Sequence, residues 1–345
     1  MVIDMYKIAA DKLTVLFGRI ADTKTLYMPI RRNGQVNFSK WSEGEEYCAE
    51  ELKTVKSAKD LFFPQSENIV AFKKEGKKIS IETGTLPDQQ FVLFGVRACD
   101  AKSFDILDKV FLAEPADQFY KARRENGIVI TTACGAPEET CFCKIFGIDA
   151  ANPGGDISTW LTDGQLYWEP ITEKGKALTE SLREILEEAD TAAVEAQKVE
   201  IVHITEQLPL TKLSLEGWNG EATKEKFDAP QWAELSQACL GCGACTFVCP
   251  TCQCYDVRDY DTGHGIQRFR CWDSCMYSDF TMMAHGTNRP TQLQRFRQRF
   301  MHKLVYFPAN NDGEYSCVGC GRCVSKCPIS MNIAKVIKAF GGDEK

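Results

Sequence analysis

Several signatures of self-contained enzymes are absent from this sequence of 345 residues. No G-x-G-x-x-G fingerprint opens a strand–helix unit, so we expect no flavin or nicotinamide bound at a Rossmann-type site on this chain. No P-loop, H-E-x-x-H or G-x-S-x-G element occurs either. Histidine is scarce, and the four residues are scattered along the sequence: His203, His264, His285 and His302. The sequence therefore gives no sign of substrate chemistry performed by this chain alone.

Long apolar runs are absent too. The longest, such as Phe91–Val96, fall far short of the roughly 20 residues that a membrane-spanning helix needs. The first residues lack the charged and apolar regions of a secretory signal. A net charge of −7 gives no general footprint of nucleic-acid binding. We expect a cytoplasmic protein with no membrane span and no nucleic-acid partner.

Cysteine, in contrast, is abundant, with 17 residues in spacings typical of metal sites rather than of a secreted disulfide framework. Two runs near the C-terminus share the spacing C-x₂-C-x₂-C-x₃-C-P of two-cluster ferredoxins. In that pattern three close thiolates bind one 4Fe-4S cluster, and the fourth, before proline, binds the neighbouring cluster. This crossed rule assigns Cys239, Cys242, Cys245 and Cys327 to one cluster, and Cys317, Cys320, Cys323 and Cys249 to the other.

Glycines inside the two runs support this assignment. Gly241, Gly243, Gly319 and Gly321 permit tight turns with positive φ and bring backbone N–H groups toward anionic sulfur. Zinc also binds four thiolates, but its sites usually show two separated C-x₂-C pairs rather than four close cysteines that end in proline. The runs therefore predict electron transfer, and a zinc-bound scaffold is the structural alternative.

Residues 1–204 are predicted to form an α/β domain. The apolar run Phe91–Arg97 predicts a buried strand, and Asp100 is expected to cap a helix that extends through Phe111. Gly127–Ala133 predicts a second buried strand after a helix near Phe119–Glu125. Three further elements are expected: a hairpin at Thr162–Gly164, an exposed helix over Glu173–Glu188 and a short strand at Glu200–Ile204.

Both predicted strands lead into a cysteine, Cys99 and Cys134. Because ligand sites form at the carboxyl ends of parallel strands, we expect these two thiols to lie close together. Cys141 and Cys143 follow shortly after Cys134. The four thiols would suffice for a third 4Fe-4S cluster, and buried thiols or a C-x-C redox pair are the alternatives.

Residues 205–235 are predicted to be a linker because turn residues and charges are mixed there with little periodicity. A mainly α-helical, ferredoxin-type domain is expected over 236–345, with an insertion at 252–316 between the two cysteine runs. The insertion carries Cys252, Cys254, Cys271 and Cys275. These could bind a fourth cluster or lie as apolar thiols beside the first cluster.

A basic amphipathic helix is expected between Arg289 and Lys303. Its cations would either form a solvated face that offsets the negative clusters or bind an acidic partner. Cys48 is isolated in an acidic stretch, and we expect it to be a free thiol.

The sequence resembles the A subunit of anaerobic sulfite reductases and the beta subunit of cytoplasmic sulfhydrogenases along nearly its whole length. The resemblance rests on Leu61–Gln65, Phe94–Asp100, Tyr120–Glu125, Thr140–Cys143, Cys249–Tyr255, Trp272–Cys275 and Cys317–Cys323. It implies several 4Fe-4S clusters, ligated by the eight cysteines of the two runs and by Cys99, Cys134, Cys141 and Cys143. Cys271 has no counterpart in the family.

The resemblance also implies the role of the chain. Subunits of this family relay electrons between a partner that binds flavin and NAD(P)H and a catalytic reductase or hydrogenase subunit. We therefore expect a non-catalytic electron-transfer subunit of an anaerobic oxidoreductase complex, with no flavin or NAD of its own. Two alternatives stay open: direct reduction of a sulfur substrate at the N-terminal cysteine cluster, and a place in a complex linked to heterodisulfide reductase.

Overall fold

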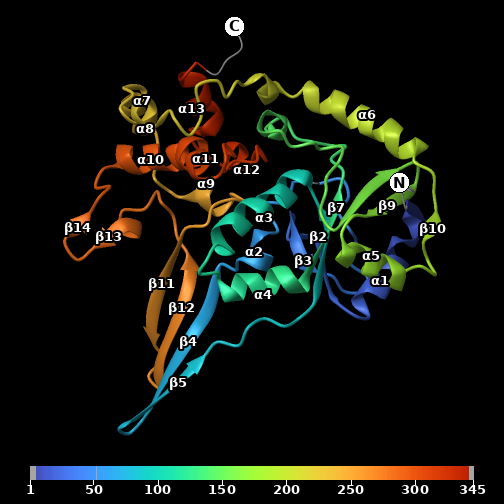
Figure 1. Ribbon diagram of the computed structural model, residues 1–345, viewed down its shortest axis with the longest axis horizontal. Helices are drawn as coiled ribbons and strands as arrows, with labels where there is room; N and C mark the ends of the chain where they lie inside the picture. The colour runs from blue at the N-terminus through green and yellow to red at the C-terminus, as the bar shows by residue number, and fades with distance from the viewer. Residues whose placement is uncertain (1–4, 52, 342–345) are drawn as a thin grey trace.

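A mixed sheet of eight strands forms the centre of the N-terminal part (Figure 1). The computed structural model describes residues 5–51 and 53–341. The strands, in the spatial order β10-β1-β9-β8-β7-β6-β2-β3, are β1 (Tyr6–Ala9), β2 (Thr25–Arg32), β3 (Gln35–Lys40), β6 (Phe91–Val96), β7 (Gly127–Thr132), β8 (Ile157–Thr162), β9 (Gln165–Pro170) and β10 (Glu187–Glu188). The four strands β2, β6, β7 and β8 are parallel, whereas the outer pairs are antiparallel.

Helices cover both faces of this sheet, which explains why β6 and β7 are buried along their whole length. Alternate residues of β6 point to opposite sides: Val92 and Phe94 pack in the core that includes α1 (Leu13–Ala21) and α5 (Glu173–Ser181). Phe91 and Leu93 pack in the core of α2, α3 and α4. The bounds of these three helices are Lys59–Phe62, Ala98–Phe111 and Gln118–Asn126. The predicted α/β character of the N-terminal part is confirmed.

Most of the predicted local elements are present, and three expectations were wrong in detail. The helix expected over 173–188 ends at Ser181. The segment expected as a strand at 200–204 belongs to α6 (Ala192–Glu206), whose buried residues Val194, Ile201 and Thr205 follow a helical spacing. Asp100 does not cap α3, because Arg97 occupies the cap position and Asp100 lies in the first turn with its carboxylate in an ion pair.

A second, antiparallel sheet joins segments far apart in the sequence. Its order is β11-β12-β4-β5, with bounds Tyr255–Asp261, Gly265–Trp272, Ser66–Glu75 and Lys78–Thr83. The pairing of β12 with β4 connects the insertion of the C-terminal part to the N-terminal part. In Figure 1 this sheet projects from the body of the molecule. The C-terminal part is therefore not helical throughout, since its insertion contributes this hairpin and the short pair β13 (Met282–Met283) and β14 (Gly286–Thr287).

Short helices around an aromatic core make up the rest of the C-terminal part. They are α7 (Thr223–Phe227), α8 (Gln231–Gln237), α9 (Ala244–Phe247), α10 (Gln292–Met301), α11 (Phe307–Asn310), α12 (Arg322–Ser325) and α13 (Ile333–Ala339). The segment 205–235, expected as a linker, contributes the buried Trp218 and Trp232 to this core. The expected basic helix is α10, which begins with a capping box between Thr291 and Gln294. In the described part of the chain, no helix combines the length and apolarity needed to cross a membrane.

A buried ion-pair network links the two halves at the second sheet. Arg270 of β12 pairs with Glu67 of β4 at 2.5 Å and with Asp117. We predict that Arg270→Met costs on the order of 3 kcal/mol of unfolding free energy, because both carboxylates lose a partner in a buried site. Urea unfolding followed by tryptophan fluorescence measures the change, with the nearby Trp272 as a local reporter.

The matched control lies on the same strand. Arg268 pairs with Asp259, and both side chains are almost half exposed. Arg268→Met should therefore cost less than about 1 kcal/mol. Equal losses in the two variants would contradict a stabilising role for the buried network.

Candidate functional site

The first run of cysteines and the end of the second run line one cavity. Cys239 and Cys242 come from the turn between α8 and α9, Cys245 lies in α9, and Cys327 follows α12. All four cysteines line this cavity, together with Met276 and Arg299. The structure thus brings together the four cysteines that the crossed rule assigns to one cluster.

The second cavity has the complementary set of cysteines. Cys317 and Cys320 lie in the loop that leads into α12, Cys323 lies in α12, and Cys249 follows α9. They line this second cavity together with Pro250. Each cavity is thus lined by three cysteines of one run and the last cysteine of the other, which is the arrangement that crossed ligation of two 4Fe-4S clusters requires.

The two motifs repeat the same backbone turn. Gly243 precedes α9 with φ +74° and ψ −7°, and Gly321 precedes α12 with φ +75° and ψ −10°. A residue with a Cβ atom is disfavoured in this left-handed conformation. At Gly243 a Cβ would also meet the Tyr277 hydroxyl at 2.6 Å, since Tyr277 covers the turn and donates a hydrogen bond to the Cys242 carbonyl.

Buried cations lie beside both cavities. Arg299 of α10 lines the two cavities, and Lys303 lines the second. Lys303 donates hydrogen bonds to Thr251 Oγ1 at 2.7 Å and to the Ser316 carbonyl at 3.0 Å. Although burial alone would lower it, the pKa of Lys303 is raised by the thiols of Cys249, Cys252 and Cys317. These cations fit an anionic occupant, because an iron–sulfur cluster with its four thiolates carries net negative charge.

Burial also acts on the thiols themselves. It raises the pKa of Cys323 to about 12 and raises the pKa of Cys317 further. Without a metal these thiols are protonated at neutral pH, so binding of iron has to release their protons. No group of three or more His, Cys, Asp or Glu side chains within residues 5–51 and 53–341 is close enough to share a single metal ion. A 4Fe-4S cluster is larger than a single metal ion, so its four cysteine ligands lie farther apart from one another.

The N-terminal cysteines form a third buried group. Cys99 lies in the first turn of α3, directly after β6, and Cys134 follows β7, as expected from the parallel sheet. Cys99, Cys134 and Cys141 are each at most 7% exposed. Cys134 and Cys141 both interact electrostatically with Cys143, whose pKa burial raises to about 12.

Arg97 supplies a buried positive charge to this third group. Its guanidinium interacts with Cys99, Cys134 and Cys141. Arg97 Nη2 lies 3.7 Å from the Asp100 carboxylate, but neither this atom nor the buried Nε has a hydrogen-bond partner within 5–51 and 53–341. Like the two cavities of the C-terminal part, the third group therefore combines thiols with an incompletely paired cation, which suits an anionic cluster.

The third group lies against the second cavity. The Phe142 amide donates a hydrogen bond to the Gly319 carbonyl at 2.8 Å, and Cys141 Sγ lies 3.9 Å from the Cys320 carbonyl. A Cβ at Gly319 would come within 2.5 Å of the Phe142 backbone, and a Cβ at Gly321 within 2.4 Å of the Thr140 carbonyl. The loops of the two sites are therefore in direct backbone contact.

A bidentate ion pair fastens this contact. Arg322 Nη1 and Nη2 donate to the two carboxylate oxygens of Asp100 at 2.6 and 2.7 Å, and both side chains are 1% exposed. Arg322 also donates to the Thr54 carbonyl. Although burial alone would raise it, the pKa of Asp100 is lowered by Arg322 and Arg97. The three cysteine groups thus lie in series: the first and second cavities share Arg299, and the second touches the third group.

The four cysteines of the insertion are not assembled in one place. Cys252 is within hydrogen-bonding reach of Cys249, and Cys275 is within reach of Cys254, where this contact lowers the pKa of Cys254 to about 7. Cys271 instead lies on β12 opposite Asp256 and interacts with Arg258. The structure therefore does not bring Cys271 to Cys252, Cys254 and Cys275.

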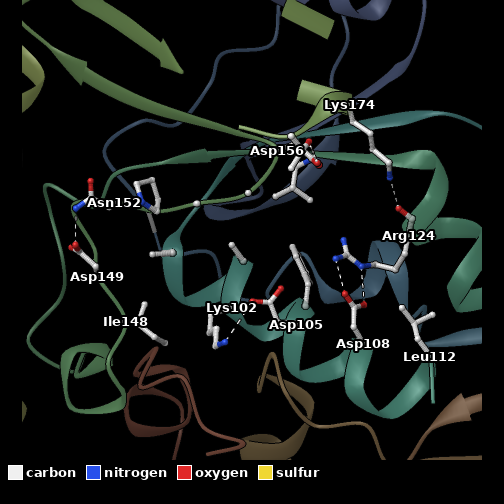
Figure 2. A pocket seen from close by; sticks show the side chains of 18 of the residues that line it. Lys102, Asp105, Asp108, Leu112, Arg124, Ile148, Asp149, Asn152, Asp156 and Lys174 are labelled. Atoms are coloured by element: carbon white, nitrogen blue, oxygen red, sulfur yellow. Dashed lines mark hydrogen bonds and ion pairs between the residues drawn. The ribbon is translucent and has the colours of Figure 1, made fainter. Parts of the chain in front are cut away.

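A larger cavity of about 810 Å³ lies between α3, α4 and the loop at 146–156. Figure 2 shows that many of its charged side chains pair within its walls. Arg124 binds both carboxylate oxygens of Asp108 at 2.8 Å, Lys102 pairs with Asp105, and Lys174 donates to the Arg124 carbonyl. Nothing in this lining identifies a ligand, and we assign the cavity no role.

Comparison with known proteins agrees with this site. Residues 238–331 match the family of 4Fe-4S dicluster domains, and this range contains all eight cysteines of the two runs. The C-terminal part is thus an iron–sulfur protein domain of the dicluster class.

A whole-chain relative defines the family more closely. The chain is 32% identical to the sulfhydrogenase 2 subunit beta of Pyrococcus furiosus over an alignment of 345 positions that covers 96% of each protein. The chain therefore belongs to the family of sulfhydrogenase beta subunits, in agreement with the resemblance of its motifs.

The close approach at Gly319 gives a test of the link between sites. Gly319→Ala should displace the loop at 140–143, because a Cβ cannot fit 2.5 Å from the Phe142 backbone. We predict a loss of bound iron together with a lower Tm, measured on anaerobically purified protein by iron analysis and thermal unfolding.

Gly313→Ala is the matched control. Gly313 has φ +81°, but nothing lies within 4 Å of its Cβ position. This variant should show only the roughly 1–2 kcal/mol cost of a left-handed alanine, with its iron content unchanged. Equal iron contents in the two variants would show that the loops tolerate separation.

Proposed function

We propose that this chain is the iron–sulfur electron-transfer subunit of a cytoplasmic, anaerobic oxidoreductase complex. It relays electrons between a partner that binds flavin and NAD(P)H and a partner that is catalytic, either a hydrogenase or a sulfite reductase-like enzyme. The observation that carries this proposal is the pair of cavities, each lined by one crossed set of four cysteines. The beta-subunit name of the relative supports a complex of several subunits and favours a hydrogenase partner.

The residues of this chain would hold the cofactors, exclude water and balance charge. The crossed sets would ligate two 4Fe-4S clusters, and Cys99, Cys134, Cys141 and Cys143 a third. Each cluster, when bound, accepts and returns one electron. Arg97, Arg299 and Lys303 supply positive charge in the buried surroundings, where the reduced and more negative state is otherwise disfavoured.

The first cavity lies nearest to solvent, which supports the cluster at this cavity as the one that exchanges electrons with a partner protein. Cys242 is exposed, and the neighbouring Leu240 is 66% exposed. In contrast, Cys99, Cys134 and Cys141 are buried. That burial disfavours the alternative in which a sulfur substrate is reduced directly at the N-terminal cysteines, since a substrate would have to reach enclosed thiols. A complex linked to heterodisulfide reductase differs only in its terminal partner.

Iron content tests the number of clusters. We expect about twelve irons and as much acid-labile sulfide in the anaerobically purified chain, and about eight in Cys134→Ser, because this variant loses one ligand of the third group. Low-temperature EPR of the reduced proteins should show the loss of a single cluster. Cys48→Ser is the control and should keep the full iron content.

Three outcomes would contradict parts of the proposal. About eight irons in the unmodified chain would restrict it to the ferredoxin pair, and zinc in place of iron would end the electron-transfer proposal. Oxidation of the reduced chain by sulfite or polysulfide, in the absence of any partner, would favour direct substrate reduction.

Crossed ligation makes a separate prediction. Cys327→Ala should impair the cluster that also uses Cys239, Cys242 and Cys245, while the other cluster stays largely intact. Cys249→Ala should have the reciprocal effect. EPR of the two reduced variants distinguishes the clusters, and loss of the same signal in both would overturn the crossed arrangement.

A further inference from the structure

Arg299 occupies a position that no other cation shares in the described part of the C-terminal half. It is the charged residue that lines both cysteine cavities, and it is only 4% exposed. It lies on α10 next to Phe300, with its guanidinium carbon 4.5 Å from the centre of the Phe300 ring. The rigid helix and the aromatic core therefore fix its charge between the two sites.

The guanidinium has no conventional partner. Within residues 5–51 and 53–341, no carboxylate pairs with Arg299, and its buried Nε has no hydrogen-bond partner. Its electrostatic neighbours are Cys245 of the first cavity, Cys323 and Cys249 of the second, and the adjacent Cys252. A buried and unpaired guanidinium is costly, so its presence implies a negative charge that the protein side chains do not provide.

We propose that Arg299 is the shared counter-charge of the two 4Fe-4S clusters and raises the reduction potentials of both. The inference rests on the proposed function, since it requires the clusters to be present. Reduction adds one electron to a cluster and makes it more negative. A fixed positive charge in a low-dielectric site stabilises that reduced state, and a charge placed between two clusters acts on each of them.

Lys303 provides an internal comparison. It lines only the second cavity, where it is held by Thr251 and Ser316. Its charge should therefore act mainly on the cluster of Cys317, Cys320, Cys323 and Cys249. Arg299 and Lys303 thus predict different patterns: one residue affects two potentials, and the other mainly affects one.

EPR-monitored redox titration of the full, cluster-loaded chain tests this pattern. We expect Arg299→Gln to shift the midpoint potentials of both dicluster-domain clusters to more negative values, and Lys303→Gln to shift mainly that of the second. Arg297→Gln is the matched control, because Arg297 lies on the same helix but packs 3.4 Å over the Phe227 ring and lines neither cavity. It should leave both potentials unchanged.

The outcomes separate this inference from the proposed function. Absence of iron from the unmodified chain would defeat the proposed function itself. With the clusters present, unchanged potentials in Arg299→Gln, or a shift of only one, would overturn the shared counter-charge.

A second variant keeps the inference testable if Arg299→Gln fails to assemble its clusters. Arg299→Lys retains the charge, so both potentials should stay close to those of the unmodified chain, and a fall in either would overturn the inference. Measured iron content of each variant shows whether the titrated clusters are fully loaded.

Discussion

The buried ion pair between Asp100 and Arg322 is the constraint on which the arrangement of the sites depends. Asp100 belongs to the helix that follows β6, and Arg322 belongs to the second cysteine motif. Their bidentate contact, far from solvent, has a strict geometry, because a misplaced charge in this environment would be left uncompensated. It therefore holds the carboxyl edge of the parallel sheet, with Cys99 and Cys134, against the dicluster domain.

Charge compensation differs between the cysteine groups and the rest of the interior. Elsewhere, buried arginines meet carboxylates, as Arg270 meets Glu67 and Asp117. Beside the cysteine groups, Arg299 faces thiols and pairs with no carboxylate of the described residues, and Arg97 faces three thiols in addition to its ion pair with Asp100. The same residue type thus has two distinct electrostatic settings, and the second one marks the places where an anionic cofactor fits.

The cysteine positions of the site could be predicted from the sequence, because they follow from short spacings within each run. The ferredoxin spacing anticipated which cysteines meet at each cavity, although the motifs are far apart in the chain. The cations of the basic helix were expected to offset the clusters from a solvated face or to bind an acidic partner, and the burial of Arg299 in α10 and of Lys303 in the π-helical turn that follows was missed. Their helical phase contained the signal: both residues fall on the same side of the helix as Phe296 and Phe300, which are buried.

Other features depend on distant pairing, since nothing in β4 alone specifies that β12, a strand far along the chain, will be its neighbour. Glu200–Ile204 was assigned as a strand because five residues are too few to distinguish the two periodicities.

Because the sheet β11-β12-β4-β5 contains strands from both halves of the chain, the two halves cannot be separated without breaking it. Sequence motifs suggest two modules that could be exchanged between proteins, yet the hydrogen bonds between β12 and β4 run across the boundary. An N-terminal half expressed alone would keep, of this sheet, only the hairpin β4–β5. Such a hairpin is marginally stable by itself, and it would expose an unpaired strand edge to other chains. We therefore expect the chain to fold as one unit, in which the hairpin β11–β12 joins the C-terminal part to the N-terminal part through the pairing of β12 with β4.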